Sequence, residues 1–170
     1  MKVLSKQTNS KYCIICGMDN AYGVKAQFYN MEDDSIGCLL TYIPEHQSYP
    51  GRVHGGMISA LLDELIGRAL WVNEPEAYGV TTSLDVSFRK PVPYNTPLKA
   101  RATLTYNSSR GFYGEGYLYD MDGKILAQAS AKYLKLPAKL ISTDTDINAE
   151  MCYNVKDDIA EIDFPEILKK

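Results

Sequence analysis

The feature that most constrains the fold is a stretch between Pro50 and Val72 that predicts a helix buried on most of its sides. From Met57 onward, apolar residues fall on nearly every side of a helical wheel, whereas a surface helix shows one apolar stripe. The stretch is too short and too charged to cross a bilayer. Other segments must therefore wrap around it. The apolar positions are Met57, Ile58, Ala60, Leu61, Leu62, Leu65, Ile66, Ala69, Leu70 and Trp71.

Two features of this helix point to a site as well as a core. Asp63 lies in the middle of the apolar run, where aspartate is a poor helix former and a carboxylate is costly to bury. His54, Gly55 and Gly56 precede the run, and a glycine pair that opens a helix leaves backbone N–H groups able to meet a negative oxygen. The alternative is a structural acid satisfied by backbone N–H groups. The glycine pair favours a functional acid.

Period-two patterning predicts strands on both sides of the helix. A hairpin precedes it, and four strands joined by short turns follow it. The last strand carries small residues at Ala127, Ala129 and Ala131, which let a helix approach the sheet closely. The expected strands are Tyr22–Tyr29, Ser35–Tyr42, Tyr78–Arg89, Leu98–Tyr106, Phe112–Asp120 and Ile125–Leu136.

These elements predict an α+β fold in which a long central helix is wrapped by one curved antiparallel sheet of about six strands. We expect a single domain over residues 1–141, with residues 1–11 loose or beginning a short helix. One sheet leaves part of such a helix uncovered, and a second copy of the chain is the simplest cover. In the strand over 78–89, strict alternation places Thr82 and Leu84 on one face and Thr81 on the other.

Composition excludes several classes of protein. The chain has 170 residues, 45% hydrophobic and 23% charged, which suits one globular domain. Its net charge of -3 argues against a nucleic-acid binder that neutralises phosphates. The N-terminus lacks the apolar core of a signal peptide, and no run could span a membrane, so we expect a cytoplasmic protein without membrane partners. Glu64 and Arg68 lie four residues apart, and we expect an exposed pair on the helix surface.

The four cysteines are expected to be reduced thiols rather than a disulfide framework. Cys13 and Cys16 have the spacing of a redox or zinc motif. No βαβ pattern surrounds them, and no second Cys-x-x-Cys supplies the four ligands of a structural zinc site. We expect two packed or loop thiols. The other cysteines are Cys38 and Cys152.

Residues 142–170 form an acidic extension with apolar residues at roughly helical spacing. It is expected to be a helix packed on the outside of the domain or a mobile tail. The apolar positions are Met151, Val155, Ile159 and Ile162. The acids are Asp144, Asp146, Glu150, Asp157, Asp158, Glu161, Asp163 and Glu166.

The order of motifs resembles the hotdog-fold acyl-CoA thioesterases, and is most similar to their phenylacetate-pathway (PaaI-like) branch. The motif is His54-Gly55-Gly56, followed by Asp63 and Glu64 on an apolar helix and then by four strands. The resemblance covers about residues 12–137. Further matches to this branch are Pro44, His46, Gln47, Pro50 and Gly51 before the helix, and Cys13, Cys16, Gly17 and Gly23 near the N-terminus.

The resemblance implies hydrolysis of an acyl-CoA thioester to a free acid and CoA, with coenzyme A entering only as part of the substrate and no further cofactor or metal. Asp63 is then the nucleophile or general base, and the Gly55 N–H, with Gly56, receives the oxyanion. His54 orients the loop or the thioester, as a neutral imidazole because a helix N-terminus disfavours its charged form. Gln47 or Ser48 positions water or the thioester carbonyl.

The spacing of Gly55 and Asp63 adds a constraint of its own. They lie eight residues apart on one helix, which is about 12 Å at the α-helical rise. One carbonyl group cannot contact both, because catalytic contacts are about 3 Å long. If both act, they belong to different subunits whose helices run antiparallel. We therefore expect a homodimer with two shared active sites, or a tetramer of two such dimers.

Cationic side chains are expected to hold the phosphates of CoA, and Arg89 and Lys90 are the preferred pair because they end a strand that follows the site. Ser83 is expected to contact water or the groups behind the carboxylate. Further cationic candidates are Arg101, Arg110 and Lys132.

One residue departs from the pattern of related enzymes. Some hotdog thioesterases place Thr or Ser one turn after the acid, where this chain has Gly67. A second polar group must then come from Ser83 or Gln47, or be absent. Two alternatives to the thioesterase stay open: a hotdog hydratase or dehydratase, and a non-catalytic acyl-CoA binding or sensor protein. The acyl group is not fixed by the sequence, although Met57, Leu61 and Trp71 are expected to line or block its pocket.

Overall fold

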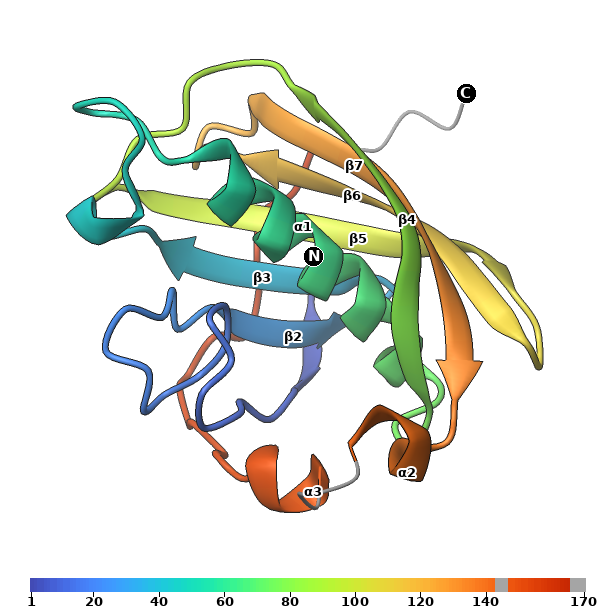
Figure 1. The fold of residues 1–170 in the computed structure, drawn as a ribbon. Helices are drawn as coiled ribbons and strands as arrows, with labels where there is room; N and C mark the ends of the chain where they lie inside the picture. Colours follow the sequence, from blue (N-terminus) through green and yellow to red (C-terminus); the bar gives the residue numbers. More distant parts are fainter. Residues whose placement is uncertain (143–146, 166–170) are drawn as a thin grey trace.

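The computed structural model describes residues 1–142 and 147–165 and shows a curved antiparallel sheet wrapped around one long helix (Figure 1). The helix α1 (Gly55–Arg68) lies across the concave face of the sheet. This is the hotdog fold, as expected. The strands are β1 (Val3–Lys6), β2 (Gln27–Met31), β3 (Ile36–Thr41), β4 (Tyr78–Phe88), β5 (Pro97–Asn107), β6 (Gly111–Tyr119) and β7 (Ile125–Leu136). The short helices are η1 (Pro44–His46), η2 (Ala69–Val72), α2 (Ala138–Ile141) and α3 (Ile147–Glu150).

The described strands form one sheet of seven, one more than expected, in the order β1-β2-β3-β5-β6-β7-β4. Neighbouring strands are antiparallel throughout. The additional strand is β1, from a segment expected to be loose, and it pairs with β2. The other edge is β4, whose 11 residues pair on one side with β7. No described helix combines the length and the apolar composition that a membrane crossing requires.

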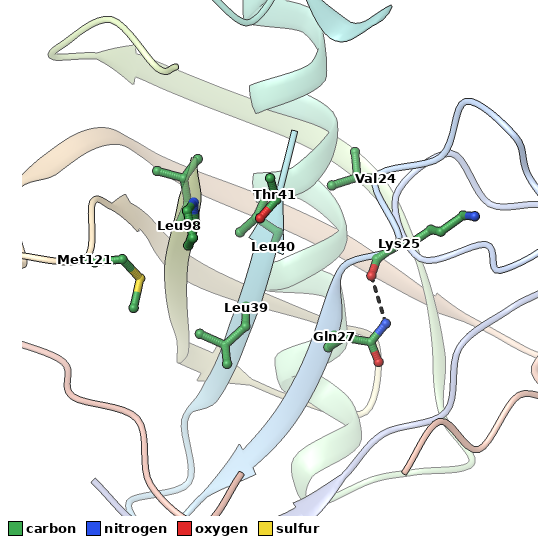
Figure 2. A pocket seen from close by; sticks show the side chains of 9 residues that line it. Val24, Lys25, Gln27, Leu39, Leu40, Thr41, Leu98 and Met121 are labelled. Atoms are coloured by element: carbon green, nitrogen blue, oxygen red, sulfur yellow. Dashed lines mark hydrogen bonds between the residues drawn. The ribbon is translucent and has the colours of Figure 1, made fainter. Parts of the chain in front are cut away.

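A hollow of about 420 Å³ opens where β2, β3 and β5 meet the loop that contains Lys25 (Figure 2). The described residues that line it include no acid, histidine or cysteine. Lys25 has a positive φ of 56°, and its carbonyl oxygen accepts a hydrogen bond from the Gln27 side chain. A backbone in this left-handed region cannot continue a strand. Strand β2 therefore begins at Gln27, later than the expected Tyr22.

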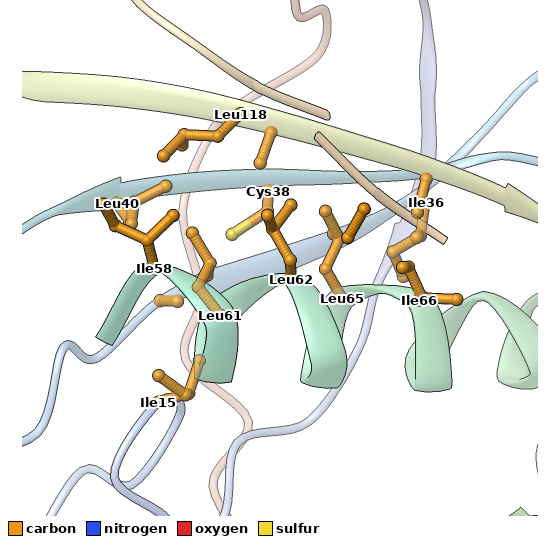
Figure 3. Packing of buried hydrophobic residues seen from close by; sticks show 14 of the residues in the cluster. Ile15, Ile36, Cys38, Leu40, Ile58, Leu61, Leu62, Leu65, Ile66 and Leu118 are labelled. Atoms are coloured by element: carbon orange, nitrogen blue, oxygen red, sulfur yellow. The ribbon is translucent and has the colours of Figure 1, made fainter. Parts of the chain in front are cut away.

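The core lies between α1 and the concave face of the sheet (Figure 3). Leu61, Leu62 and Leu65 are completely buried there. Two glycines of β6 allow the close approach, since a Cβ at Gly114 or Gly116 would lie 2.7 or 2.9 Å from the Ile66 side chain. The alanines expected at the crossing are buried too. They are Ala127, Ala129 and Ala131.

The helix keeps one uncovered stripe along its length. Gly56 is exposed, and the residues one, two and three turns further along are half-buried. The stripe follows the spacing of three or four residues that places side chains on one helical face. Asp63 lies in this stripe and not in the core. The half-buried members are Ser59, Ala60, Asp63 and Gly67.

Strand β4 contains a β-bulge that changes which threonine faces the helix. Thr81 pairs with Tyr133 and Ser83 with Lys132, so Thr82 is the extra residue. A bulge shifts the alternation of side chains by one position. Thr81 therefore faces the helix together with Leu84, and the expected placement of Thr82 on that face was wrong.

The acidic extension is neither an outer helix nor a separate tail where it is described. Apart from the single turn of α3, it is extended and forms bridges from Tyr153 to Asn9 and from Glu161 to Lys2. It then runs behind the sheet (Figure 1), where Ile162 and Phe164 are buried. They pack on the outer-face residues Tyr29, Met31 and Tyr119. The acids Asp144, Asp146 and Glu166 lie outside the described residues.

The close helix–sheet approach predicts a specific coupling between Gly116 and Ile66. Gly116→Ala is expected to lower the free energy of unfolding by about 1–3 kcal/mol, because the added Cβ overpacks against the Ile66 side chain. In an Ile66→Ala background the same change is expected to cost less, since the side chain that it meets is gone. Urea unfolding of the four proteins measures the coupling, and equal costs in both backgrounds would contradict it.

Candidate active site

The Asp63 carboxylate is held by two hydroxyl groups from neighbouring strands. Its Oδ1 accepts hydrogen bonds from Thr81 Oγ1 at 2.8 Å and from the Tyr133 hydroxyl at 3.0 Å. The Tyr133 hydroxyl also lies 2.7 Å from the Asp63 carbonyl oxygen. Asp63 Oδ2 has no hydrogen-bond partner among the described residues. One oxygen thus fixes the orientation of the carboxylate, and the other keeps its lone pairs available.

Tyr133 is suited to donating this hydrogen bond. Burial, together with the neighbouring Asp63 carboxylate, raises the pKa of the Tyr133 phenol well above its usual value. The phenol therefore stays protonated over the whole physiological range. Its ring is stacked on Phe112 with 4.5 Å between the ring centroids, which fixes its position.

The space beside Gly67 is occupied by the same tyrosine. A Cβ at Gly67 would lie 3.5 Å from the Tyr133 ring. The helix has no hydroxyl one turn after the acid, and the sheet supplies hydroxyls from Tyr133 and Thr81 to the carboxylate. Ser83 does not supply one, because the bulge places it on the outer face of β4.

The helix begins with one free backbone donor. His54 is the N-cap, and its Nδ1 accepts a hydrogen bond of 2.8 Å from the Gly56 N–H. Nδ1 therefore carries no proton, and the Gly56 N–H is not available to a ligand, contrary to our expectation. The Gly55 N–H has no partner among the described residues. The Phe88 ring lies beside it, 3.3 Å from where a Cβ of Gly55 would be.

The loop before the helix is held by backbone contacts and by His46. The His54 N–H donates to the His46 carbonyl oxygen at 2.8 Å, and Gln47 bridges to Val53. His46 itself is buried, with Nε2 2.6 Å from the Tyr22 carbonyl oxygen. Gln47 and Ser48 are exposed beside the start of α1. Neither contacts Asp63.

The cationic candidates lie in different places. Arg89 and Lys90 are exposed directly after Phe88, at the Gly55 end of the helix. Arg110 lies in the turn between β5 and β6, at the opposite end of the sheet, where its carbonyl oxygen accepts from the Lys135 N–H. Arg101 was wrongly included, because it is buried on the outer face in an ion pair with Asp33. Lys132 lies over the Tyr113 ring.

A cavity of about 470 Å³ lies beside Asp63. Thr81, Tyr133 and Gly67 line it together with Asp63, and much of the remaining lining is apolar. Trp71 lines it as expected, whereas Leu61 is buried in the core. The apolar lining comes from the N-terminal loop, from α1 and η2, and from the segment after β7. Its members include Ile14, Ile15, Ala60, Trp71, Ile141, Ile147 and Met151.

Glu64 pairs with Arg68 as expected, but the pair is buried rather than exposed. Arg68 Nε lies 2.8 Å from Glu64 Oε1, and the two side chains are 3% and 20% exposed. Cys13 Sγ donates to Glu64 Oε2 at 2.8 Å. Burial alone would raise the pKa of the Glu64 carboxyl, but the Arg68 charge and these hydrogen bonds hold it below its usual value.

This pair predicts a pH-dependent contribution to stability. A carboxylate with a depressed pKa stabilises the folded state above its usual titration range, and that contribution is lost as the pH falls through the lowered pKa. Glu64→Gln is expected to lower the free energy of unfolding at pH 7 by about 3 kcal/mol, because Arg68 is left unpaired. The difference from wild type should shrink below about pH 4. Urea titrations from pH 7 to 3 measure it, with the exposed Glu76→Gln as control; a difference independent of pH would contradict the assignment.

Two residues of the site, Thr81 and Tyr133, were not predicted from the sequence. Thr81 was placed on the wrong face because a bulge leaves no mark in simple alternation. Tyr133 lies 70 residues from Asp63 along the chain. The sequence did contain one indication of Tyr133. It is a tyrosine on the alanine-rich face of the last strand, opposite Gly67.

Comparison with known proteins agrees with the fold. A model of the thioesterase superfamily matches residues 50–127. Acyl-coenzyme A thioesterase THEM4 of Rattus norvegicus is 30% identical over 112 residues, which are 65% of this chain and 47% of that protein. An uncharacterised protein of Schizosaccharomyces pombe is 28% identical over 119 residues, 66% of this chain and 67% of the relative. The chain thus spans about half the length of the mammalian relative.

Solved structures give the same result. A crystal structure of a thioesterase superfamily protein has 25% identity and a TM-score of 0.66, with 72% of this chain and 63% of that chain covered. A Bacillus halodurans protein solved with CoA has 25% identity and a TM-score of 0.60, with 68% and 77% covered. In its fold and in these matches, the chain is similar to proteins of the thioesterase superfamily.

Proposed function

We propose that the protein is an acyl-CoA thioesterase that hydrolyses an acyl-CoA to a free acid and CoA. The observation that carries the proposal is the Asp63 carboxylate beside a cavity, with Oδ1 held by two hydroxyls and Oδ2 without a partner among the described residues. The names of the rat relative and of the CoA-bound bacterial structure support the substrate class.

The chemistry requires a base or nucleophile and a group that stabilises negative charge. Asp63 Oδ2 either attacks the thioester carbonyl carbon or removes a proton from the attacking water. Negative charge then develops on the carbonyl oxygen, and the Gly55 N–H at the positive end of the helix dipole receives it. Collapse of the tetrahedral species breaks the carbon–sulfur bond, and the sulfur leaves as the thiol of CoA with a proton that comes from water. Where Asp63 is the nucleophile, the acyl–Asp63 anhydride left behind is then hydrolysed by water to the free acid. Removal of one oxyanion donor typically costs about 10²–10³ in turnover.

The two groups act on one carbonyl only if they come from different subunits. Both lie on α1, eight residues or about 12 Å apart. A second copy of the chain has two surfaces to bind. One is the uncovered stripe of α1, and the other is the outer edge of β4, which has no neighbouring strand in the described sheet. In an antiparallel pairing, Gly55 of one subunit meets Asp63 of the other. A tetramer of two such dimers is compatible with this arrangement.

The dimer also accounts for the placement of the cations. Arg89 and Lys90 lie at the Gly55 end of the helix, where the CoA portion would leave the site. Arg110 lies at the Asp63 end of its own chain, so the same antiparallel pairing brings it toward Arg89 of the other subunit. Their charges complement the phosphates of CoA. His54, Gln47 and Ser48 lie next to the oxyanion donor and position the thioester.

The activity is tested by measuring the release of free thiol from five substrates, which are acetyl-, hexanoyl-, lauroyl-, phenylacetyl- and benzoyl-CoA. Asp63→Asn is expected to lower turnover of the best substrate by about 10³-fold or more, because the amide can still accept from both hydroxyls but cannot act as base or nucleophile. Substrate binding should be retained. The matched control is Asp85→Asn, which removes an exposed acid of β4. Equal turnover in wild type and Asp63→Asn would contradict the assignment, and tight binding without turnover of any substrate would favour a binding protein.

Complementation between variants tests the shared site. Gly55→Pro deletes the N–H, and the extended conformation of His54, with φ -63° and ψ 135°, accommodates a following proline at the first helical position. Each of Gly55→Pro and Asp63→Asn alone should be nearly inactive. After co-refolding in equal amounts, half of the dimers are mixed and each has one intact site of two, so about one quarter of wild-type activity should return. Failure of the mixture to recover activity, or a fully active monomer by light scattering, would contradict the shared site.

A further inference from the structure

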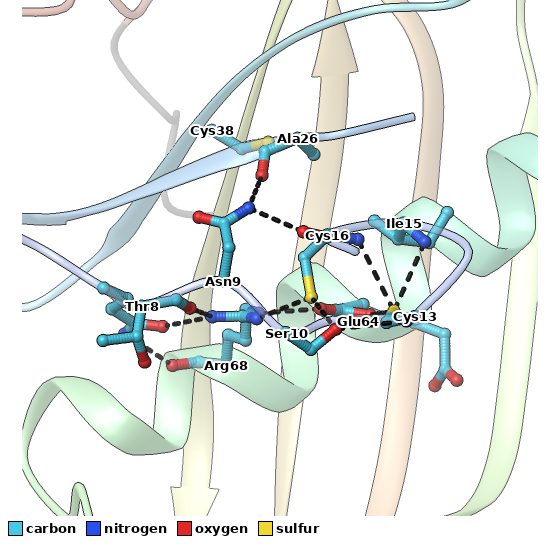
Figure 4. A network of polar contacts seen from close by, with 12 residues as sticks. Thr8, Asn9, Ser10, Cys13, Ile15, Cys16, Ala26, Cys38, Glu64 and Arg68 are labelled. Atoms are coloured by element: carbon cyan, nitrogen blue, oxygen red, sulfur yellow. Dashed lines mark hydrogen bonds and ion pairs between the residues drawn. The ribbon is translucent and has the colours of Figure 1, made fainter. Parts of the chain in front are cut away.

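A second cluster of reactive groups lies in the wall of the same cavity and takes no part in the proposed hydrolysis (Figure 4). It consists of Cys13 and Cys16 from the N-terminal loop with Glu64 and Arg68 from α1. One ligand atom each from Cys13, Cys16 and Glu64 lies within 4.8 Å of the others. Cys13 Sγ is folded back over the loop, where it accepts from the Cys16 N–H at 3.5 Å.

The loop that carries the two thiols is fixed in place. Asn9, which is completely buried, donates to the carbonyl oxygens of Cys16 and Ala26 at 2.8 and 2.9 Å. The Gly17 N–H donates to the Cys13 carbonyl oxygen at 2.8 Å. The two sulfur atoms are therefore held near each other by the loop itself, and both side chains line the cavity.

The surroundings of the two sulfur atoms differ. Arg68 donates from Nη2 to Cys16 Sγ at 3.0 Å, whereas Cys13 donates to the Glu64 carboxylate. The contact with Cys13 lowers the pKa of Cys16, and the Arg68 charge acts in the same direction, against the effects of burial and of the Glu64 charge. The pKa of Cys13 is raised by its contact with Cys16, by burial and by Glu64. The pair therefore contains one sulfur prone to form a thiolate and one that stays a thiol.

The positive charge of Arg68 lies against the Glu64 carboxylate and the Cys16 sulfur, and it serves as the counter-ion of this cluster. Arg68 bonds to Glu64 and to the Thr8 carbonyl oxygen at 3.0 Å, and its guanidinium lies 4.4 Å from the centre of the Phe28 ring. A metal ion at Cys13, Cys16 and Glu64 would compete with this fixed positive charge for the same sulfur and carboxylate. The described residues also supply only three ligands to such an ion. The arrangement favours thiol chemistry over metal binding.

We propose that Cys13 and Cys16 form a reversible, oxidisable dithiol that regulates access of substrate to Asp63. The regulatory part rests on the proposed thioesterase function. The oxidant is a hydroperoxide small enough to enter the cavity, for which hydrogen peroxide is the probe.

The chemistry proceeds in two balanced steps. The Cys16 thiolate attacks one peroxide oxygen, the O–O bond breaks, and the departing hydroxide takes up a proton to give water and a Cys16 sulfenic acid. Cys13 sulfur then attacks Cys16 sulfur and displaces the hydroxyl, which leaves as water with the proton of Cys13, with Glu64 in position to relay it. The two thiols lose two electrons in total, and the peroxide is reduced to two waters.

Disulfide formation has a direct consequence for the site. Cys13 can no longer donate to Glu64, and Cys16 can no longer carry negative charge beside Arg68. Glu64 directly follows Asp63 on α1, and the loop lines the cavity that Asp63 faces. We expect oxidation to lower turnover about tenfold, since displacement of a reacting group by a fraction of an ångström has effects of this order.

The test uses the full chain carrying Cys152→Ser, which removes the exposed cysteine. The native protein is treated with hydrogen peroxide, quenched with catalase, denatured and alkylated with iodoacetamide. Trypsin then releases Tyr12–Lys25 with both cysteines. The expected result is an unalkylated peptide lighter by two hydrogens, a parallel fall in turnover, and recovery of both on reduction with dithiothreitol. In the control Cys16→Ser, which lacks the attacking thiolate and keeps the Cys13 hydrogen bond to Glu64, turnover should be the same with and without peroxide.

Several results would overturn the proposal. These are full alkylation of both cysteines after peroxide, sulfinic acid without a disulfide, stoichiometric zinc in the purified protein that Cys13→Ser abolishes, and a disulfide that leaves turnover unchanged. The mass measurement needs no substrate. Absence of acyl-CoA hydrolysis would therefore defeat the proposed function and the regulatory role, while the mass alone still decides whether the disulfide forms.

Discussion

The structure depends on how closely the central helix approaches the sheet. Gly114 and Gly116 leave room for Ile66, and the buried alanines of β7 present only small side chains to the helix. Each fully buried leucine of α1 contributes about 1.5–3 kcal/mol, which is enough to offset an aspartate in mid-helix. Because the packing fixes the rotation of the helix about its axis, it also determines which stripe stays uncovered. Asp63 belongs to that stripe, so the core places the reactive group.

The site combines contributions from distant parts of the chain. The helix supplies the carboxylate and the free N–H, two paired residues of β4 and β7 supply the hydroxyls, and the N-terminal and C-terminal segments line the cavity. Gly67 offers no hydroxyl to the carboxylate, and Tyr133, whose ring lies beside that glycine, donates one from the sheet. The carboxylate thus keeps two hydrogen-bond donors although the helix offers none one turn later.

Much of the fold could be predicted because its signals are local. The apolar helix and the four strands after it appear at nearly the expected residues, and Asp63 lies at the cavity. The partners of Asp63 could not be predicted, because the bulge that turns Thr81 inward and the pairing that brings Tyr133 opposite it are set by strand register. The acidic segment was misjudged for a similar reason. Its apolar spacing fits a helix, but Ile162 and Phe164 are buried instead by an extended chain that packs on the outer face of the sheet.

The most direct test of the central claim is a structure of the protein bound to an acyl-CoA analogue. In this analogue a methylene group replaces the thioester sulfur. The account predicts a dimer in which the ketone oxygen accepts a hydrogen bond from the Gly55 N–H of one subunit. The carbonyl carbon should lie either about 3 Å from Asp63 Oδ2 of the other subunit, or one bridging water away from it. A monomer with the analogue bound, or a carbonyl group held away from either residue, would contradict the account.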